Sequence, residues 1–405
     1  MLMFVVQPGS RQQFDLDKAT PEFDAQLREL SGFYLEGRRA TAETADDLLQ
    51  KLPPEQLRQL RDKMLIRLVR NKVLDLCRHS DMWLVAADGT GLYTFSKRHC
   101  PHCTSKTSNG VTTYAHNVLE MKLISPCGLA ISLESEFITN RDGETKQDCE
   151  LKAFVRAAAR LKQTWPKMRF MFLLDGLYPN TTIMRVCKEN GWDYMVTLKD
   201  GNLPLMSKVA LPRLESQPDG KTSHWVDAST SQEIRWVENL RHDGHITHVI
   251  SCDETTRAAD GKKTTAHFRW ITSVRPSACN PVHLCNKVGR QRWKIENQGF
   301  NAQKNGGYKL EHGYGVIGHA WQNYYLLIQI VDMIMQLATR TDAIHKLPGL
   351  ERGRTSEGRP KSLLEIYKSM KNFIKRLGES FRLQAPSWLD PAQLGRIQLR
   401  ILAPG

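Results

Sequence analysis

The chain has 405 residues, with 57 Lys and Arg against 43 Asp and Glu, so its formal net charge at pH 7 is +14. This length allows two or three domains, and the positive charge favours a polyanionic partner such as nucleic acid. No apolar stretch is long enough to span a membrane and the nine cysteines are scattered, so we expect a cytoplasmic protein with free thiols and no membrane association.

The N-terminal region, residues 1–80, is predicted to be helical. Thr44, followed by Asp47, is a candidate cap for one helix, and Pro53-Pro54-Glu55 begins another. In the second helix an apolar seam alternates with arginines that lie largely on another face. The seam is Leu57, Leu60, Met64 and Leu68, and the arginines are Arg58, Arg61, Arg67 and Arg70. This basic face is either a nucleic-acid contact or a solvated helix surface.

Two apolar runs each stop at Asp-Gly. Residues 82–87 precede Asp88, and residues 169–174 precede Asp175. A short apolar run stopped by a turn former predicts a buried strand, here with a carboxylate at its exit. An aspartate beside a hydrophobic core needs a cationic partner, so the two acids suggest one shared metal site.

The segments around these runs predict the order β-β-β-α-β-α-β. They are strands at 114–124 and 129–138, a helix at 151–161, a helix capped by Asn180 or Thr181 that ends at Gly191, and a strand at 194–198. Right-handed crossovers then place the two Asp-bearing strands side by side. Residues 202–280 predict a β-rich antiparallel insertion with Asp-Gly turns at Asp219, Asp243 and Asp260.

Residues 292–296 predict a helix with Arg292 and Glu296 on one face. Two strand-end aspartates and a helical glutamate suit Mg²⁺, for which Mn²⁺ is an expected substitute, and two such ions about 4 Å apart promote phosphodiester cleavage or transfer. Further on, residues 320–337 predict a packed helix, 348–360 a linker, and 361–377 a basic amphipathic helix.

The sequence His99-Cys100-Pro101-His102-Cys103 has the spacing of half a zinc site, which His116 or Cys127 would complete. No second Cys-x-x-Cys pair is present. A redox pair and a loop with incidental thiols are the alternatives, and the sequence leaves all three open.

The residues around the three acids resemble the DDE transposases of bacterial insertion sequences, in the RNase H-like superfamily and close to the ISNCY-type members. The resemblance covers about residues 40–340. It rests on residues 84–90, 173–176 and 292–297, with Phe300, Asn301 and Lys304. It implies that Asp88, Asp175 and Glu296 are the catalytic, metal-binding triad, and we expect Arg292 and Lys304 to contact substrate. The implied activity is Mg²⁺-dependent DNA strand cleavage and strand transfer at element ends.

The implied fold is α/β, an RNase H-like core with a mixed sheet. Its first part is residues 81–201, the β-rich insertion is 202–280, and 281–340 holds the core helices with the third acid. Residues 1–80 and 341–405 are the flanking helical regions. Double-stranded DNA, both element ends and target, is the expected partner, with a homodimer in the DNA complex as one arrangement.

The chain departs from the Tyr-x2-Arg-x3-Glu-x6-Lys pattern of hairpin-forming relatives, with Gly289 at the Tyr position and Gln303 at the Lys position. A hairpin and a non-hairpin mechanism both remain open. So do an element-derived DNA-binding protein without activity and a nuclease of the same fold without strand transfer. Asp142, Asp200 and Glu134 are the substitutes considered for a member of the triad.

Overall fold

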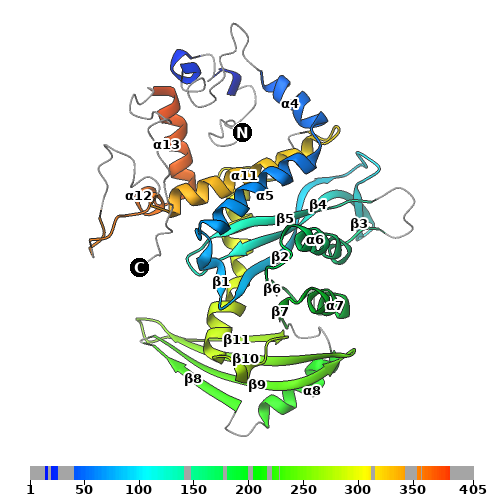
Figure 1. The fold of residues 1–405 in the computed structure, drawn as a ribbon, viewed down its shortest axis with the longest axis vertical. Coiled ribbons are helices and arrows are strands. Elements are labelled where there is room, and N and C mark those ends of the chain that lie inside the picture. The colour runs from blue at the N-terminus through cyan, green and yellow to red at the C-terminus, as the bar shows by residue number, and fades with distance from the viewer. Residues whose placement is uncertain are drawn as a thin grey trace. The chain divides into compact units, whose positions relative to one another are not determined.

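The computed structural model describes most of the chain. The described residues are 14–16, 20–25, 41–140, 147–176, 180–198, 204–216, 221–227, 229–311, 315–342, 354–356 and 358–383. The chain forms two compact units (Figure 1), the first from residues 1–75, 92–99 and 299–405 and the second from 76–91 and 100–298. Within the described residues, no helix combines the length and the apolar character that a membrane crossing needs.

The described residues form one mixed sheet of 11 strands. The strands that correspond to the predicted core are β2 (Met82–Phe95), β4 (Val111–Ile124), β5 (Ala130–Ile138), β6 (Phe170–Leu174) and β7 (Asp193–Thr197). Their order is β5-β4-β2-β6-β7, and both β2–β6 and β6–β7 are parallel. The prediction that the two Asp-bearing strands lie side by side is therefore confirmed.

Burial explains why these runs are strands. The β2 residues 82–87 and all of β6 are buried, as expected for a sheet covered on both faces. However, β2 does not stop at Asp88-Gly89 but continues to Phe95, so the prediction of a strand end there was wrong. Glycine is tolerated inside a strand where another group approaches the backbone closely, and Gly89 meets that condition. The second run does end before Asp175.

Helices α6 (Glu150–Thr164) and α7 (Thr181–Asn190) pack next to each other (Figure 1). The apolar face of α6 includes Phe154 and Leu161, both buried. Asn180 caps α7, where its side chain accepts a hydrogen bond from the backbone N–H of Ile183 at 3.2 Å. Gly191 ends the helix at φ +69°, the left-handed conformation that favours glycine. The predicted cap and stop are confirmed.

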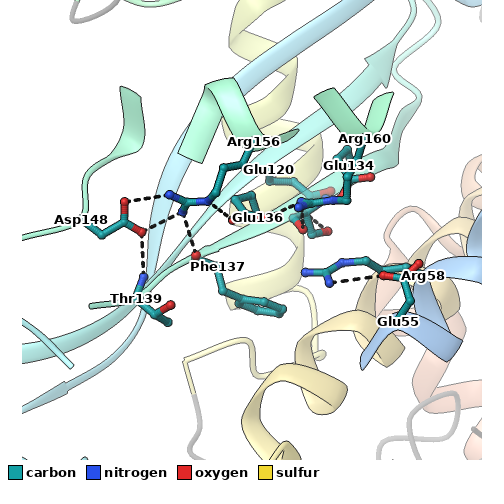
Figure 2. Close-up of polar contacts among 11 residues, drawn as sticks. Glu55, Arg58, Glu120, Glu134, Glu136, Phe137, Thr139, Asp148, Arg156 and Arg160 are labelled. Carbon is teal, nitrogen blue, oxygen red and sulfur yellow. Dashed lines mark hydrogen bonds and ion pairs between the residues drawn. The ribbon is translucent and has the colours of Figure 1, made fainter. Parts of the chain in front are cut away.

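An ion network joins α6 to β5 (Figure 2). Arg156 makes a bidentate pair with Asp148, with N–O distances of 3.1 and 2.7 Å, and also pairs with Glu136. Arg160 pairs with Glu134 at 3.1 Å and with Glu136. Burial alone would raise the pKa of the Asp148 carboxyl, but the Arg156 guanidinium outweighs burial and lowers it. Glu134, considered as a substitute catalytic acid, therefore belongs to this network.

Residues 222–272 form antiparallel strands as predicted, with turns at Asp243 and Asp260. Asp219 lies outside the described residues. The strands are β8 (Thr222–Val226), β9 (Thr230–His242), β10 (His245–Arg257) and β11 (Lys263–Thr272), all antiparallel. Because β11 pairs with β7, they extend the same sheet instead of forming a separate one. A helix, α8 (Pro204–Glu215), precedes them and was not predicted.

The remaining short elements of the second unit include β1 (Arg78–His79), which pairs with β2, and β3 (Thr104–Ser108), which pairs with β4. The 3-10 helices η1 (Asp75–Cys77) and η3 (Pro276–Ala278) are single turns; η1 begins in the first unit and ends in the second.

In the first unit, α11 (Ala320–Arg340) packs against α4 (Ala42–Lys51) and α5 (Pro54–Arg70). The Asn323 side chain donates to the backbone carbonyls of Leu49 and Leu52, both at 2.7 Å, which ties α11 to the link between α4 and α5. Thr41, not Thr44, caps α4. Arg61 is buried, so it is not part of an exposed basic face of α5 as predicted.

The predicted helix at 361–377 is two helices, α12 (Leu363–Tyr367) and α13 (Met370–Leu383). Lys368 adopts φ +63° between them, a left-handed conformation that ends a helix. Ser362 and Glu365 form a capping box at the start of α12.

We expect Arg156→Met to lower the free energy of unfolding by about 3 kcal/mol, because it leaves the buried Asp148 carboxylate without its guanidinium partner and removes one of the two guanidinium groups that pair with Glu136. The matched control is Arg185→Met, whose pair with Glu189 is exposed and is expected to contribute less than about 1 kcal/mol. Urea denaturation of both variants measures the difference. Equal losses in the two variants would show that the network does not stabilise the fold.

Candidate active site

The two aspartates meet across the parallel pair of β2 and β6. The paired register of β2 and β6 ends at Ala86 and Leu173; two residues further on, Asp88 continues β2 and Asp175 follows the end of β6. The charge of Asp175 contributes to the raised pKa of Asp88, so the two carboxyls are near each other. Asp175 is buried and the Asp88 side chain is 18 % exposed. The sheet therefore fixes two carboxylates at neighbouring positions.

The segment that carries Glu296 is helical but irregular, in contrast to the regular helix predicted. It consists of α9 (Pro281–His283), a π-helical turn η4 (Leu284–Val288), a 3-10 turn η5 (Gly289–Trp293), a second π-helical turn η6 (Ile295–Phe300) and α10 (Asn301–Asn305). π-Helical turns within helices are frequent at functional sites, because they change the direction of the side chains that follow. Glu296 lies on the second of these turns.

Arg292 links the third acid to the first. Its Nη2 lies 2.8 Å from Glu296 Oε1 and its Nη1 lies 3.5 Å from Asp88 Oδ2. The Arg292 side chain is only 4 % exposed, and its Nε and Nη1 atoms make no hydrogen bond to the described residues. One buried guanidinium thus stands between two of the predicted acids and has further donors to offer.

The pKa of Asp88 reports the crowding of charge at this place. Burial raises the pKa of its carboxyl, the Arg292 guanidinium opposes that rise, and the negative charges of Asp175, Glu296 and Glu150 add to it, with a result of about 7. Asp175 and Glu296 are therefore both close enough to Asp88 to interact with it. Their roles in catalysis stay predictions.

Glu150 is a fourth acid that the sequence reasoning missed. It is the first residue of α6, and a Cβ added at Gly89 would lie 2.1 Å from its Oε1 atom. The carboxylate thus lies directly against the backbone next to Asp88. A glutamate in the first turn of a helix is common for electrostatic reasons, so the sequence offered no signal that separated it from an ordinary helix start.

The acids fit a hard divalent cation by their chemistry, because all are carboxylates, the donors that Mg²⁺ prefers. Their ligand oxygens do not all lie within 4.8 Å of one another. This spacing does not form a cage for a single ion held by all three acids at once. The sharing of the acids between two ions stays a prediction.

Two hollows of the second unit lie beside the acids. One, of about 570 Å³, is lined by Gly89, Glu150 and Asn180 among others. The other, of about 700 Å³, is lined by residues of β8 to β10 and by the segment just before Glu296. Its polar and aromatic lining includes Glu254, Lys287, Arg290, Trp293 and Lys294.

The other predicted site residues have structural partners. Lys304, on α10 in the first unit, pairs with Glu311 at 2.7 Å. Gln303, at the Lys position of the hairpin-type pattern, is buried and donates to Gln329 and Asp332 at 2.9 and 2.7 Å. Asp142 and Asp200 lie outside the described residues.

Gly289, at the Tyr position of the same pattern, is held there by close packing. A Cβ at this residue would lie 2.7 Å from Met195 Cε and 2.8 Å from Trp270 Cε2, closer than real Cβ contacts come. No side chain fits between the 3-10 turn and strands β7 and β11. The absence of a side chain at this position therefore has a steric reason.

Gly289→Ala is expected to lower the free energy of unfolding by about 1–3 kcal/mol, because the added methyl group overpacks a filled site. Gly91→Ala is the matched control, since its Cβ would make only an ordinary contact, 3.5 Å from Asn117 Oδ1. Thermal unfolding of both proteins provides the comparison. A Gly289→Ala protein as stable as Gly91→Ala would contradict the close packing.

Comparisons with known proteins leave the family open. No protein-family model matches the chain. A 71-residue stretch, 18 % of this chain, is 34 % identical to the mitochondrial inner membrane protease ATP23 homolog of Mus musculus, and the match spans about a third (34 %) of the mouse protein. Among solved structures, a piggyBac transposase synaptic complex with hairpin DNA is similar at a TM-score of 0.36 and 12 % identity, covering 96 % of this chain and 73 % of that one. A TM-score this low does not assign a fold.

Proposed function

We propose that this protein is a DDE transposase of the RNase H-like superfamily, which cleaves DNA at the ends of a bacterial insertion sequence and joins them to a target. The observation that carries the proposal is the proximity of Asp88, on β2, and Asp175, directly after the adjacent parallel strand β6, with Arg292 linking Asp88 to Glu296. The strand order β5-β4-β2-β6-β7, with a helix after β5 and another after β6, supports an RNase H-like core.

In this proposal Asp88, Asp175 and Glu296 hold Mg²⁺, or Mn²⁺ in its place. When bound, the metal ions activate the attacking oxygen and stabilise the leaving one. Arg292 keeps Glu296 oriented through its 2.8 Å contact, and its buried guanidinium, 3.5 Å from Asp88, offsets part of the negative charge of the acids. Glu150 adds a carboxylate at the edge of the site, where it raises the local negative charge and with it the affinity for cations.

The hollow before Glu296 suits the phosphate backbone of double-stranded DNA. Lys287, Arg290 and Lys294 bring positive charge to its lining, and the Trp293 side chain is 49 % exposed. Exposed aromatic rings next to cationic groups are typical of surfaces that stack on bases and neutralise phosphates. DNA held there lies against the segment that carries the third acid.

Asp88→Asn, Asp175→Asn and Glu296→Gln are each expected to reduce metal-dependent nicking and joining of end-containing DNA at least about 100-fold, because each removes a charged ligand of the metal. The control is Glu189→Gln on α7, an exposed acid. Gel assays with labelled element ends measure cleavage and joining separately, and a binding assay measures affinity for DNA.

Each outcome of these assays has a meaning. Wild-type nicking by Asp175→Asn would refute the assignment of the triad. Nicking without joining would identify a nuclease of this fold. DNA binding without either reaction in the wild-type protein would identify a DNA-binding protein derived from such an element.

The charge-reversing variants Lys287→Glu and Lys294→Glu are expected to weaken DNA binding and to reduce the slope of log affinity against log salt by about one or more for each lost phosphate contact. Lys188→Glu on α7 makes the same charge change at an exposed lysine that does not line the hollow. Fluorescence anisotropy at several salt concentrations measures all three. If Lys188→Glu weakens binding as much as the other two, the hollow is not the DNA site.

A further inference from the structure

A second cluster of metal-binding residues lies away from the acids in the same unit, formed by Cys100, Cys103 and His116. The two cysteines lie in the loop between β2 and β3, and His116 lies on β4. Among the described residues this is the group of three or more potential ligands whose ligand atoms all lie within 4.8 Å of one another. Its members lie close together in the sequence, before and after the turn of the β3–β4 hairpin.

Strand pairing brings the ligands together. Thr104 of β3 pairs with Ala115 of β4, so the preceding residue, Cys103, falls beside His116. The backbone N–H of Cys103 donates to the carbonyl of Cys100 at 3.3 Å, and this turn brings the two sulfurs to the same side. Of the two residues predicted to complete the cluster, His116 is the one that lies beside the two cysteines. Cys127 Sγ instead contacts Ser125 Oγ at 2.9 Å.

The separations match those of a tetrahedral metal centre. The two sulfurs lie 3.5 Å apart, and His116 Nε2 lies 3.5 Å from Cys100 Sγ and 3.6 Å from Cys103 Sγ. Bonds of about 2.3 Å from zinc to sulfur and about 2.0–2.1 Å from zinc to nitrogen place two sulfurs about 3.8 Å apart and a sulfur and a nitrogen about 3.6 Å apart. The sulfurs are too far apart for a disulfide, whose S–S bond is about 2.05 Å.

We propose that Cys100, Cys103 and His116 bind a structural Zn²⁺ ion. Two thiolates and an imidazole are the donors that zinc prefers, and they differ from the oxygen donors of the acid cluster, which suit Mg²⁺. Cys103 and His116 are almost fully buried, so the ion is shielded from solvent on their side. Three protein ligands would leave the fourth position of a tetrahedral centre for a water molecule, whereas most structural zinc sites have four protein ligands.

The ion would fasten the loop after β2 to the β3–β4 hairpin. The residues next to its ligands, Thr104 and Asn117, are joined by a hydrogen bond of 2.9 Å and line the hollow beside Gly89. Asn140 also donates to the carbonyl of Cys103 at 3.0 Å. The zinc ion therefore stabilises one wall of that hollow without contributing to the acids.

The test is the metal content of the full chain, purified without a histidine tag from cells grown with added zinc. Inductively coupled plasma mass spectrometry is expected to find about one zinc ion per chain in the wild type and less than about a tenth of that in Cys103→Ser. Cys127→Ser, which changes another buried cysteine, is the matched control and is expected to keep its zinc. Less than about a tenth of an equivalent in the wild type, or full zinc in Cys103→Ser, would overturn the proposal.

A second measurement covers the case in which Cys103→Ser fails to fold. Wild-type protein loaded with Co²⁺ is expected to show the thiolate-to-cobalt charge-transfer band and the visible absorption of a tetrahedral site. Absence of that band, or a Cys100–Cys103 disulfide in a protein without zinc, would decide against a metal centre. None of these readouts depends on DNA cleavage, so they stand or fall separately from the transposase proposal.

Discussion

Like charges held at adjacent strand positions are the constraint on which the rest of the second unit depends. The parallel pair of β2 and β6 brings Asp88 near Asp175, which follows the end of β6, and Glu150 and Glu296 add their charges from two other elements. Burial is the main cause that raises the pKa of Asp88 to about 7, and repulsion from the neighbouring carboxylates adds to it. The buried runs of both strands hold the acids in place against this repulsion, and Arg292 offsets part of it.

The two charged centres of this unit differ in how they are balanced. The network of Asp148 and Glu136 with Arg156 is closed, because each carboxylate has a direct guanidinium partner, and it serves stability. Around Asp88, the Arg292 guanidinium pairs with Asp88 and Glu296 at 3.5 and 2.8 Å, and the charges of Asp175 and Glu150 also act on Asp88. A carboxyl whose pKa is shifted by burial and by several neighbouring charges is more frequent at functional sites than elsewhere.

The sequence predicted the parts of this fold that depend on local pattern. Local sequence patterns predicted the buried runs, the N-cap at Asn180 and the end of that helix at Gly191, since each depends on a few adjacent residues. The continuation of β2 through Gly89 was not, because it depends on Glu150 approaching from a helix 61 positions later in the chain. The irregular turns around Glu296 were also missed, because a regular helical pattern of residues does not distinguish an α-helix from 3-10 and π-helical turns.

The central claim is that Asp88, Asp175 and Glu296 jointly bind divalent metal ions, and anomalous scattering from crystals soaked in Mn²⁺ tests it most directly. If the three acids bind metal ions together, manganese peaks lie within bonding distance of the Asp88 and Asp175 carboxylates, with Glu296 bound to one of the ions. Crystals that bind manganese elsewhere while these three carboxylates contact only protein would contradict it.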